Sequence, residues 1–144
     1  ENIDVSDFDS FKNNAFDILD QSVKLKTDAT KVDTDVKAYA ATISNANLEK
    51  LKADYASLRG ISKSSKELNT KIGELDTQGK ALLGSAKSVS PRTKSPAATS
   101  LTNKSIKGLD ASRKNLDAVA TLVSADTKLL ADELKKRGQT VEED

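Results

Sequence analysis

The sequence predicts an all-α fold, an elongated up-down-up antiparallel bundle of three long helices. Three long segments repeat apolar residues at alternating spacings of three and four, the period of a helix with one buried stripe. Aromatic residues make up only 3% of the 144 residues, so Leu, Ile, Val and Ala must build the core. Short connections make consecutive helices antiparallel. We expect a single bundle domain over residues 1–144.

The first helix is expected at about residues 7–44. Ser6 followed by Asp9 resembles a capping box at its start, and Ser44 and Asn45 interrupt the pattern at its end, where they can cap the next helix. Ten of the eleven stripe positions are apolar. The stripe consists of Phe8, Phe11, Ala15, Ile18, Ser22, Leu25, Ala29, Val32, Val36, Tyr39 and Ile43.

The second helix is expected at about residues 46–87, and its stripe slips once. Tyr55, Leu58 and Ile61 follow one another in two consecutive steps of three, so the helix should overwind, bend or pause near Gly60. A complete break at Gly60 would give a four-helix bundle, which stays the alternative architecture.

Three further glycines weaken this helix, by about 1 kcal/mol each relative to Ala where they are exposed. They are Gly73, Gly79 and Gly84. Gly79 falls on the apolar stripe, where a missing side chain lets a neighbouring backbone come close.

The third helix is expected at about residues 96–137, after a loop over residues 88–95. Ser95 and Pro96 form a strong start signal, and Gly138 can take the left-handed conformation just past the end. Residues 139–144, with the sequence QTVEED, should form a disordered acidic tail. The stripe runs through Ile106, Leu109, Leu116, Ala120, Val123, Leu130 and Leu134, and Leu122 and Leu129 widen it.

The composition argues against catalysis. His, Cys, Met and Trp are absent, which removes the imidazole base, the thiolate nucleophile, haem ligation and the usual zinc site. No calcium-hand or phosphate-loop pattern occurs either. We expect no enzyme activity, no cofactor and no metal. Three carboxylate pairs are expected on water-facing sides: Asp33 with Asp35, Asp17 with Asp20, and Asp132 with Glu133.

Positive charge is concentrated in one stretch, because six basic and no acidic residues lie between Asp76 and Asp110. They could contact phosphate, lipid headgroups, acidic glycans or an acidic protein. The simpler interpretation, which we prefer on sequence grounds, is a solvated face partly neutralised by the acidic start of the first helix. Nucleic acid is not expected as a partner, since stacking aromatics and a high net charge are missing. This basic set consists of Lys80, Lys87, Arg92, Lys94, Lys104 and Lys107.

The functional expectation is a non-enzymatic exported protein, the mature part of a bacterial surface or periplasmic lipoprotein acting as a spacer or docking module. It rests on the absence of Met and Cys together with the uninterrupted bundle pattern. An N-terminal lipid anchor would lie upstream, and no transmembrane segment is expected in this chain. Two alternatives stay open: a lipid or amphiphile carrier that opens beside the second helix, and an intracellular helical adaptor. The sequence leaves the oligomeric state undefined.

Overall fold

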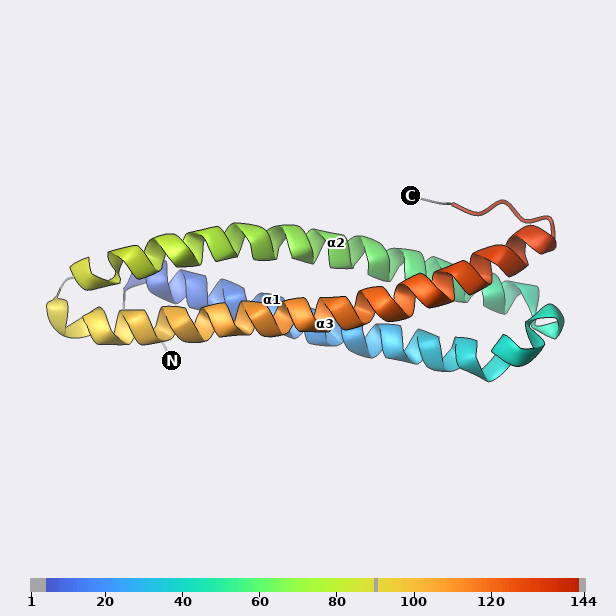
Figure 1. Cartoon of the computed structure of the whole chain (residues 1–144), viewed down its shortest axis with the longest axis horizontal. Coiled ribbons are helices and arrows are strands. Elements are labelled where there is room, and N and C mark those ends of the chain that lie inside the picture. The colour runs from blue at the N-terminus through green and yellow to red at the C-terminus, as the bar shows by residue number, and fades with distance from the viewer. Residues whose placement is uncertain (1–4, 90, 143–144) are drawn as a thin grey trace. The chain divides into compact units, whose positions relative to one another are not determined.

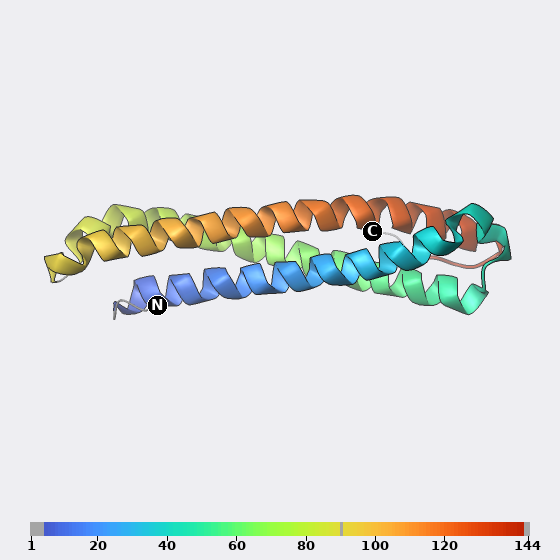
Figure 2. The same ribbon diagram turned by 90° about the horizontal axis from the view of Figure 1, so that it is seen from below.

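The computed structural model describes residues 5–89 and 91–142 and confirms the predicted three-helix bundle (Figure 1). Helix α2 runs opposite to α1 and α3 (Figures 1 and 2). The α-helices are α1 (Ser6–Tyr39), α2 (Leu48–Ser85) and α3 (Ser95–Lys136). Short 3₁₀ helices in the connections are η1 (Ala40–Asn45), η2 (Ala86–Ser88) and η3 (Arg92–Lys94).

The described chain forms two compact units, and each of the three long helices contributes to both. Unit 1 takes residues 5–23, 67–89 and 91–115. Unit 2 takes residues 24–66 and 116–142.

The core of unit 1 joins the start of α1 to the end of α2 and the start of α3. Phe8, Ala86, Val89 and Ala98 form one buried cluster there. Farther along, Phe11 fills the space that the missing side chain of Gly79 leaves, since a Cβ at Gly79 would lie 2.6 Å from the Phe11 Cζ. The sequence predicts a close backbone at Gly79, and an aromatic side chain of α1 lies there instead.

The core of unit 2 is one aliphatic cluster drawn from all three helices, in which Tyr55 is the only aromatic among the fully buried members described. Its buried members are Ala29, Val36, Leu51, Tyr55, Leu58, Ile61, Val119, Val123, Leu130, Ala131 and Leu134.

Helix α2 is continuous through Gly60, so the four-helix alternative does not occur. Asp54 and Tyr55 are both buried, with 6% and 7% of their surfaces exposed, so two neighbouring residues of α2 face the core here. With Asp54 on the stripe, the steps from Leu51 through Leu58 to Ile61 are three, four and three. The alternation of three and four is therefore unbroken from Leu51 onward, and α2 passes Gly60 without a pause.

Helix α3 has a similar polar residue on its stripe. Val119 is fully buried and Ala120 is exposed, so the expected position of Ala120 on the stripe is wrong by one residue. From Val119 the repeat passes through Val123 and Asp126 to Leu130 in steps of four, three and four. Asp126 is only 6% exposed.

The helix starts use other capping groups than expected. The Asp9 carboxylate accepts a hydrogen bond from the Val5 N–H at 3.0 Å, so Val5 takes the place expected for Ser6. Asn47, and not Ser44 or Asn45, caps α2 by accepting the Lys50 N–H at 3.2 Å. A capping side chain must lie directly before the first helical turn, whereas Ser44 and Asn45 belong to η1 and are separated from Leu48 by Ala46 and Asn47.

Ser95 also differs from its expected role. Its hydroxyl donates to the Ala86 carbonyl at 2.6 Å and so ties the two ends of the α2–α3 connection together.

Helix α3 ends in a Schellman motif. Gly138 has a φ of 78°, the left-handed conformation predicted for it, and its N–H donates to the Lys135 carbonyl at 3.0 Å. The Gln139 N–H donates to the Leu134 carbonyl at 2.9 Å. This turn reverses the chain direction just after the helix.

Arg137 joins the end of α3 to the α1–α2 connection within unit 2. Its guanidinium donates to the carbonyls of Ile43 and Ala46, each at 2.7 Å, and to that of Ser44 at 3.1 Å. It also forms an ion pair with Glu133 at 2.9 Å. The Ile43 carbonyl also accepts the Ala46 N–H at 3.0 Å, so Arg137 adds a second donor there and supplies charged donors to the carbonyls of Ser44 and Ala46. No helix in the described ranges is long and apolar enough to cross a membrane.

Candidate functional site

The basic set lies in unit 1, where α2 ends and α3 begins. Lys80 is in α2, Lys87 in η2, Arg92 and Lys94 are in η3, and the last two lysines are in α3. Lys94 is half-buried and the other five are exposed. In both ribbon views the start of α1 lies at this end of unit 1 (Figures 1 and 2), as the up-down-up order predicts.

Lys104 and Lys107 are the two members that share one groove. It is shallow, runs along the first turns of α3, and has a volume of about 590 Å³. The other four basic residues lie outside it. Its remaining lining residues carry hydroxyl and amide groups, apart from Pro96: Ser95, Pro96, Thr99, Ser100 and Asn103. Hydroxyl, amide and ammonium groups are the donors that bind oxyanions.

Little of this positive charge is neutralised by direct pairing. Lys80 forms an ion pair with Asp76 at 3.3 Å. Within residues 5–89 and 91–142, the other five members form no ion pair. At the start of the described part of α1, the Asp9 carboxylate is buried and bonded to the Val5 N–H, and Asp7 is exposed. Neither of these two carboxylates forms an ion pair with the basic set.

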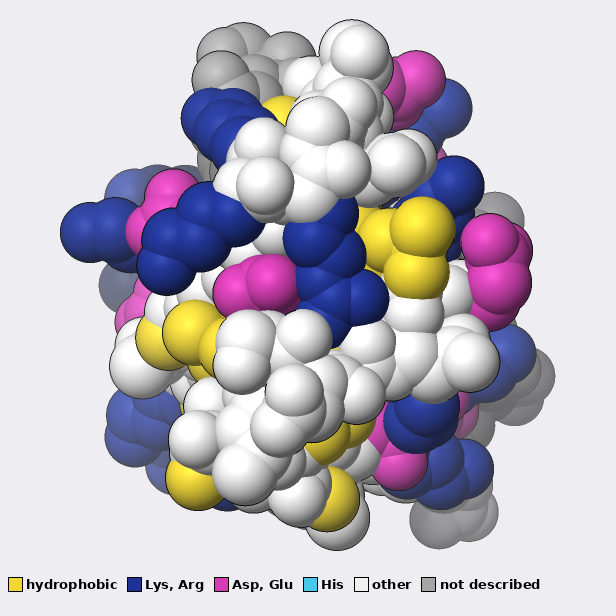
Figure 3. All heavy atoms as spheres, turned by 90° about the vertical axis from the view of Figure 1, so that its right-hand side faces the viewer, with side chains coloured by type: hydrophobic (Ala, Val, Ile, Leu, Met, Phe, Trp, Pro, Cys, Tyr) yellow, Lys and Arg dark blue, Asp and Glu magenta, His cyan; other side chains and the backbone are white. Residues whose placement is uncertain are grey.

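The surface carries charges of both signs at the end of unit 2 that holds the α1–α2 connection (Figure 3). Figure 3 views the molecule from that side, where positive and negative side chains alternate and hydrophobic ones are scattered. A surface of mixed sign offers no single-sign patch for a charged partner.

Buried carboxylates are the feature that sequence reasoning missed. Asp17, Asp20 and Asp132 are exposed, as expected. The expectation is wrong for Asp33 and Glu133, each only 7% exposed. Each can be buried because a cation on the next helical turn binds it, as Lys37 binds Asp33 at 2.8 Å and Arg137 binds Glu133.

Asp33 and Asp126 bring two carboxyl groups from α1 and α3 into contact inside unit 2. Burial raises the pKa of Asp126 to about 6, and the hydrogen bond and charge of Asp33 add to this increase. The hydrogen bond from Lys37 lowers the pKa of Asp33 against the opposing effect of burial. Oδ2 of Asp126 is buried without a hydrogen-bond partner among the described residues. A proton on Asp126 therefore supplies a donor that the pair otherwise lacks.

A second buried carboxylate, Asp54 of α2, accepts a hydrogen bond from the Tyr39 hydroxyl at 2.7 Å. Burial raises the pKa of the Tyr39 phenol far above its usual value, and the bond to Asp54 raises it further. Lys50 bridges Asp54 at 4.0 Å and Asp35 at 3.2 Å. The described residues hold no group of three or more carboxylates placed to bind a metal ion. These contacts join α1 to α2 through a polar cluster in which Asp54 is buried and Lys50 is exposed.

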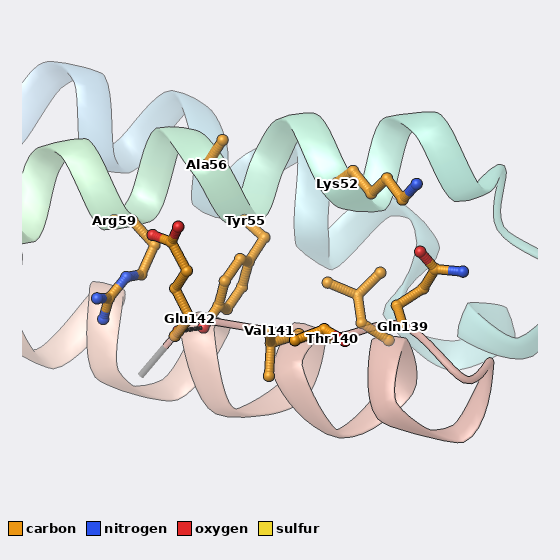
Figure 4. A pocket seen from close by; sticks show the side chains of 9 residues that line it. Lys52, Tyr55, Ala56, Arg59, Gln139, Thr140, Val141 and Glu142 are labelled. Carbon is orange, nitrogen blue, oxygen red and sulfur yellow. Dashed lines mark hydrogen bonds between the residues drawn. The ribbon is translucent and has the colours of Figure 1, made fainter. Parts of the chain in front are cut away.

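Residues 139–142, which we call the strap, follow the Schellman turn and lie between α2 and α3 in unit 2 (Figure 4). Val141 packs against the core of unit 2, and the Tyr55 hydroxyl donates to the Glu142 carbonyl. The disordered tail expected over residues 139–144 thus has a described part that contacts two helices, while residues 143–144 lie outside the described ranges. The groove beside the strap has a volume of about 440 Å³.

Comparisons with known proteins assign no family to this architecture. No protein-family model matches the chain, and neither a curated protein nor a solved structure matches it.

Proposed function

We propose that the protein is a non-enzymatic docking module that binds the phosphate headgroups of an anionic membrane surface through the basic end of unit 1. The observation that carries the proposal is the groove in which Lys104 and Lys107 stand beside hydroxyl and amide side chains. Five members of the basic set have no ion-pair partner within the described residues, so their charge is available to an anionic surface.

The chemistry of this groove favours headgroups over an acidic protein. Protein interfaces gain most of their affinity from buried aromatic or apolar anchors in well-packed pockets. The groove is shallow, and Pro96 is the only apolar residue among those that line it. Lysines near an anionic membrane instead contribute about 1 kcal/mol each without needing a pocket.

Co-sedimentation with vesicles of phosphatidylglycerol and phosphatidylcholine tests this proposal. We expect binding at about 50 mM salt and its loss at about 500 mM, because salt screens exposed charges. Lys104→Glu combined with Lys107→Glu should weaken binding by at least about thirtyfold, which corresponds to the two lost contributions of roughly 1 kcal/mol each.

The matched control reverses two exposed lysines of α1 in unit 2, Lys24→Glu with Lys31→Glu, so the net charge changes equally. Equal loss of binding in both double variants would mean that net charge alone acts and would overturn the proposal. Absence of binding to anionic vesicles at low salt would overturn it as well. A bundle that loses its tertiary packing on the vesicles would instead support the alternative of a carrier that opens beside α2.

Export from the cytoplasm is the second part of this proposal. It is supported by the lack of Cys and tested by cell fractionation with an antibody to this chain. Recovery with the cytoplasmic fraction alone would favour the intracellular adaptor.

A further inference from the structure

The strap lines one side of a groove of about 440 Å³, and two basic side chains of α2, Lys52 and Arg59, line the other side. The groove is formed within unit 2 by one face of α2 and by Leu134 of α3. Figure 4 shows Lys52 and Gln139 at one end of the groove and Arg59 and Glu142 at the other, so the strap runs in the direction of α2. On α2 the lining residues are Lys52, Tyr55, Ala56 and Arg59.

The groove recognises the strap through features that another segment can reproduce. Tyr55 donates to a backbone carbonyl, a contact that does not depend on the side chain of the bound residue. Val141 supplies one apolar side chain, which packs against the core of unit 2. The contacts described for the strap therefore require only an extended backbone and one apolar side chain.

Charge defines what else the bound segment should contain. Residues 52, 56, 59, 63 and 66 follow one another in steps of four and three, which places them on one face of α2. Four of these five residues are Lys or Arg, and Ala56 leaves space between them. Lys63 is exposed and has no ion pair among the described residues. Continuing beyond the strap, an extended segment would meet Lys63 and Lys66 within about three residues, at 3.3 Å per extended residue against 1.5 Å per helical residue.

We propose that this groove binds an extended peptide segment of a partner protein, in which an apolar residue is followed by acidic residues, and that the strap occupies it until such a segment arrives. While the strap occupies the groove, a competing segment cannot bind. The apparent affinity of that segment is therefore reduced in proportion to the fraction of time that the groove is open. This binding site belongs to unit 2, whereas the basic set belongs to unit 1, so either proposal can fail without the other.

Removal of the strap should expose the site. The chain shortened to end at Gly138 keeps the Schellman glycine and the Arg137 contacts. The probe is a synthetic peptide with the sequence of residues 139–144, QTVEED, titrated by calorimetry. We expect the peptide to bind the shortened chain at least about tenfold more tightly than the full chain, as for an occupant that is bound about nine-tenths of the time. A shortened chain that keeps its helicity and does not bind the peptide overturns the proposal.

Two variants of the groove locate the binding. Ala56→Glu adds bulk and negative charge to the lining of the groove, and in the shortened chain it should abolish peptide binding. Ala53→Glu adds the same side chain at an exposed position of α2 outside the lining and should leave binding unchanged. Equal binding by both variants would exclude the groove as the site.

The full-length chain gives a second measurement if the shortened chain unfolds. Val141→Ser weakens the apolar contact of the strap without removing any residue, and it should increase peptide affinity over the parent chain. An unchanged or lower affinity contradicts the proposal. Full-length chains that dimerise by exchanging straps, seen as a concentration-dependent mass in light scattering, would identify a second copy as the occupant and overturn the assignment to a partner.

Discussion

Asp33 of α1 and Asp126 of α3 are neighbours inside unit 2 and shift each other's pKa, while Lys37 binds Asp33 from the next helical turn at 2.8 Å. Ionising both of two neighbouring buried carboxyl groups is unfavourable, because their negative charges repel each other in a poorly solvated site. Lys37 stabilises the charge on Asp33, so the proton stays with Asp126. The pair acts as one acid with one strongly favoured site for its proton.

The first prediction is a stability maximum in mildly acidic solution. The pKa of Asp126 is raised from 3.8 to about 6 in the folded chain, so its contribution is complete below 3.8 and is lost as the pH rises through 6. The pKa of Asp33 is lowered, so its contribution is present above 3.8 and is lost as the pH falls through its folded value. The free energy of unfolding should therefore be about 2 kcal/mol larger near about pH 4.5 than near about pH 7.5.

Urea unfolding followed by circular dichroism at these two values measures the difference. Asp126→Asn keeps the shape and can still donate to Asp33, so it should remove most of the pH dependence. Asp132→Asn, at an exposed position of the same helix, is the control and should retain it. The same pH dependence in Asp126→Asn as in the parent would show that other groups cause it.

The second prediction concerns Gly79 and Gly73, two glycines of α2 with opposite surroundings. A Cβ at Gly79 meets the Phe11 ring at 2.6 Å, whereas one at Gly73 meets nothing within 4 Å. Gly73→Ala should stabilise the chain by about 0.5 to 1 kcal/mol through helix propensity. Gly79→Ala gains the same propensity but overpacks the core, at a cost of roughly 1 to 3 kcal/mol.

Thermal unfolding of both variants should show Gly73→Ala melting above the parent and Gly79→Ala below it, with about 2 kcal/mol between them. If both variants melt above the parent, Phe11 adjusts its position at no cost and the close contact is not a constraint.

The third prediction concerns Arg137, whose guanidinium donates to carbonyls of the α1–α2 connection. Arg137→Gln removes these charged hydrogen bonds and leaves the buried Glu133 carboxylate without its cation. We expect a loss of about 3 kcal/mol in the free energy of unfolding. The neighbouring Lys136 is exposed, and Lys136→Gln should change stability by less than about 0.5 kcal/mol. Similar losses in the two variants would argue against a specific role for the guanidinium.

The fourth prediction concerns the Tyr39 phenol. The chain has two tyrosines, so Tyr55→Phe leaves Tyr39 as the one phenol that can titrate. Because burial and the bond to Asp54 raise the pKa of Tyr39, ultraviolet absorbance should detect no tyrosinate until the pH is well above 10. A midpoint near 10 in a chain that is still helical would mean that the Tyr39 hydroxyl is not held by Asp54.

The fold could be predicted because most buried residues are apolar and their spacing is regular. The prediction erred where a polar residue occupies a stripe position. Reading apolar residues alone includes Tyr55 but misses Asp54, although both are buried. Reading the alternation of three and four strictly would have identified Asp54 and Asp126 as buried, since both fit the repeat.

The candidate sites were predicted less completely than the fold. The basic set could be found from charge alone, but the sequence did not indicate that Lys104 and Lys107, and no others of the set, share a groove. The strap could not be predicted because a short polar segment with one apolar residue resembles a frayed end. Its position depends on the Tyr55 hydroxyl, which lies 87 residues away in the chain.

The contacts of Arg137 also set an order of events during synthesis. Ala46 and Arg137 are 91 residues apart, so the ribosome completes the α1–α2 connection long before it delivers the guanidinium that bonds to it. At about 5 to 20 residues per second, the carbonyls of that connection lack the Arg137 guanidinium for roughly 5 to 18 seconds. During this interval the carbonyls that Arg137 later binds are exposed at one end of the nascent helical hairpin. A chaperone has access to the backbone there.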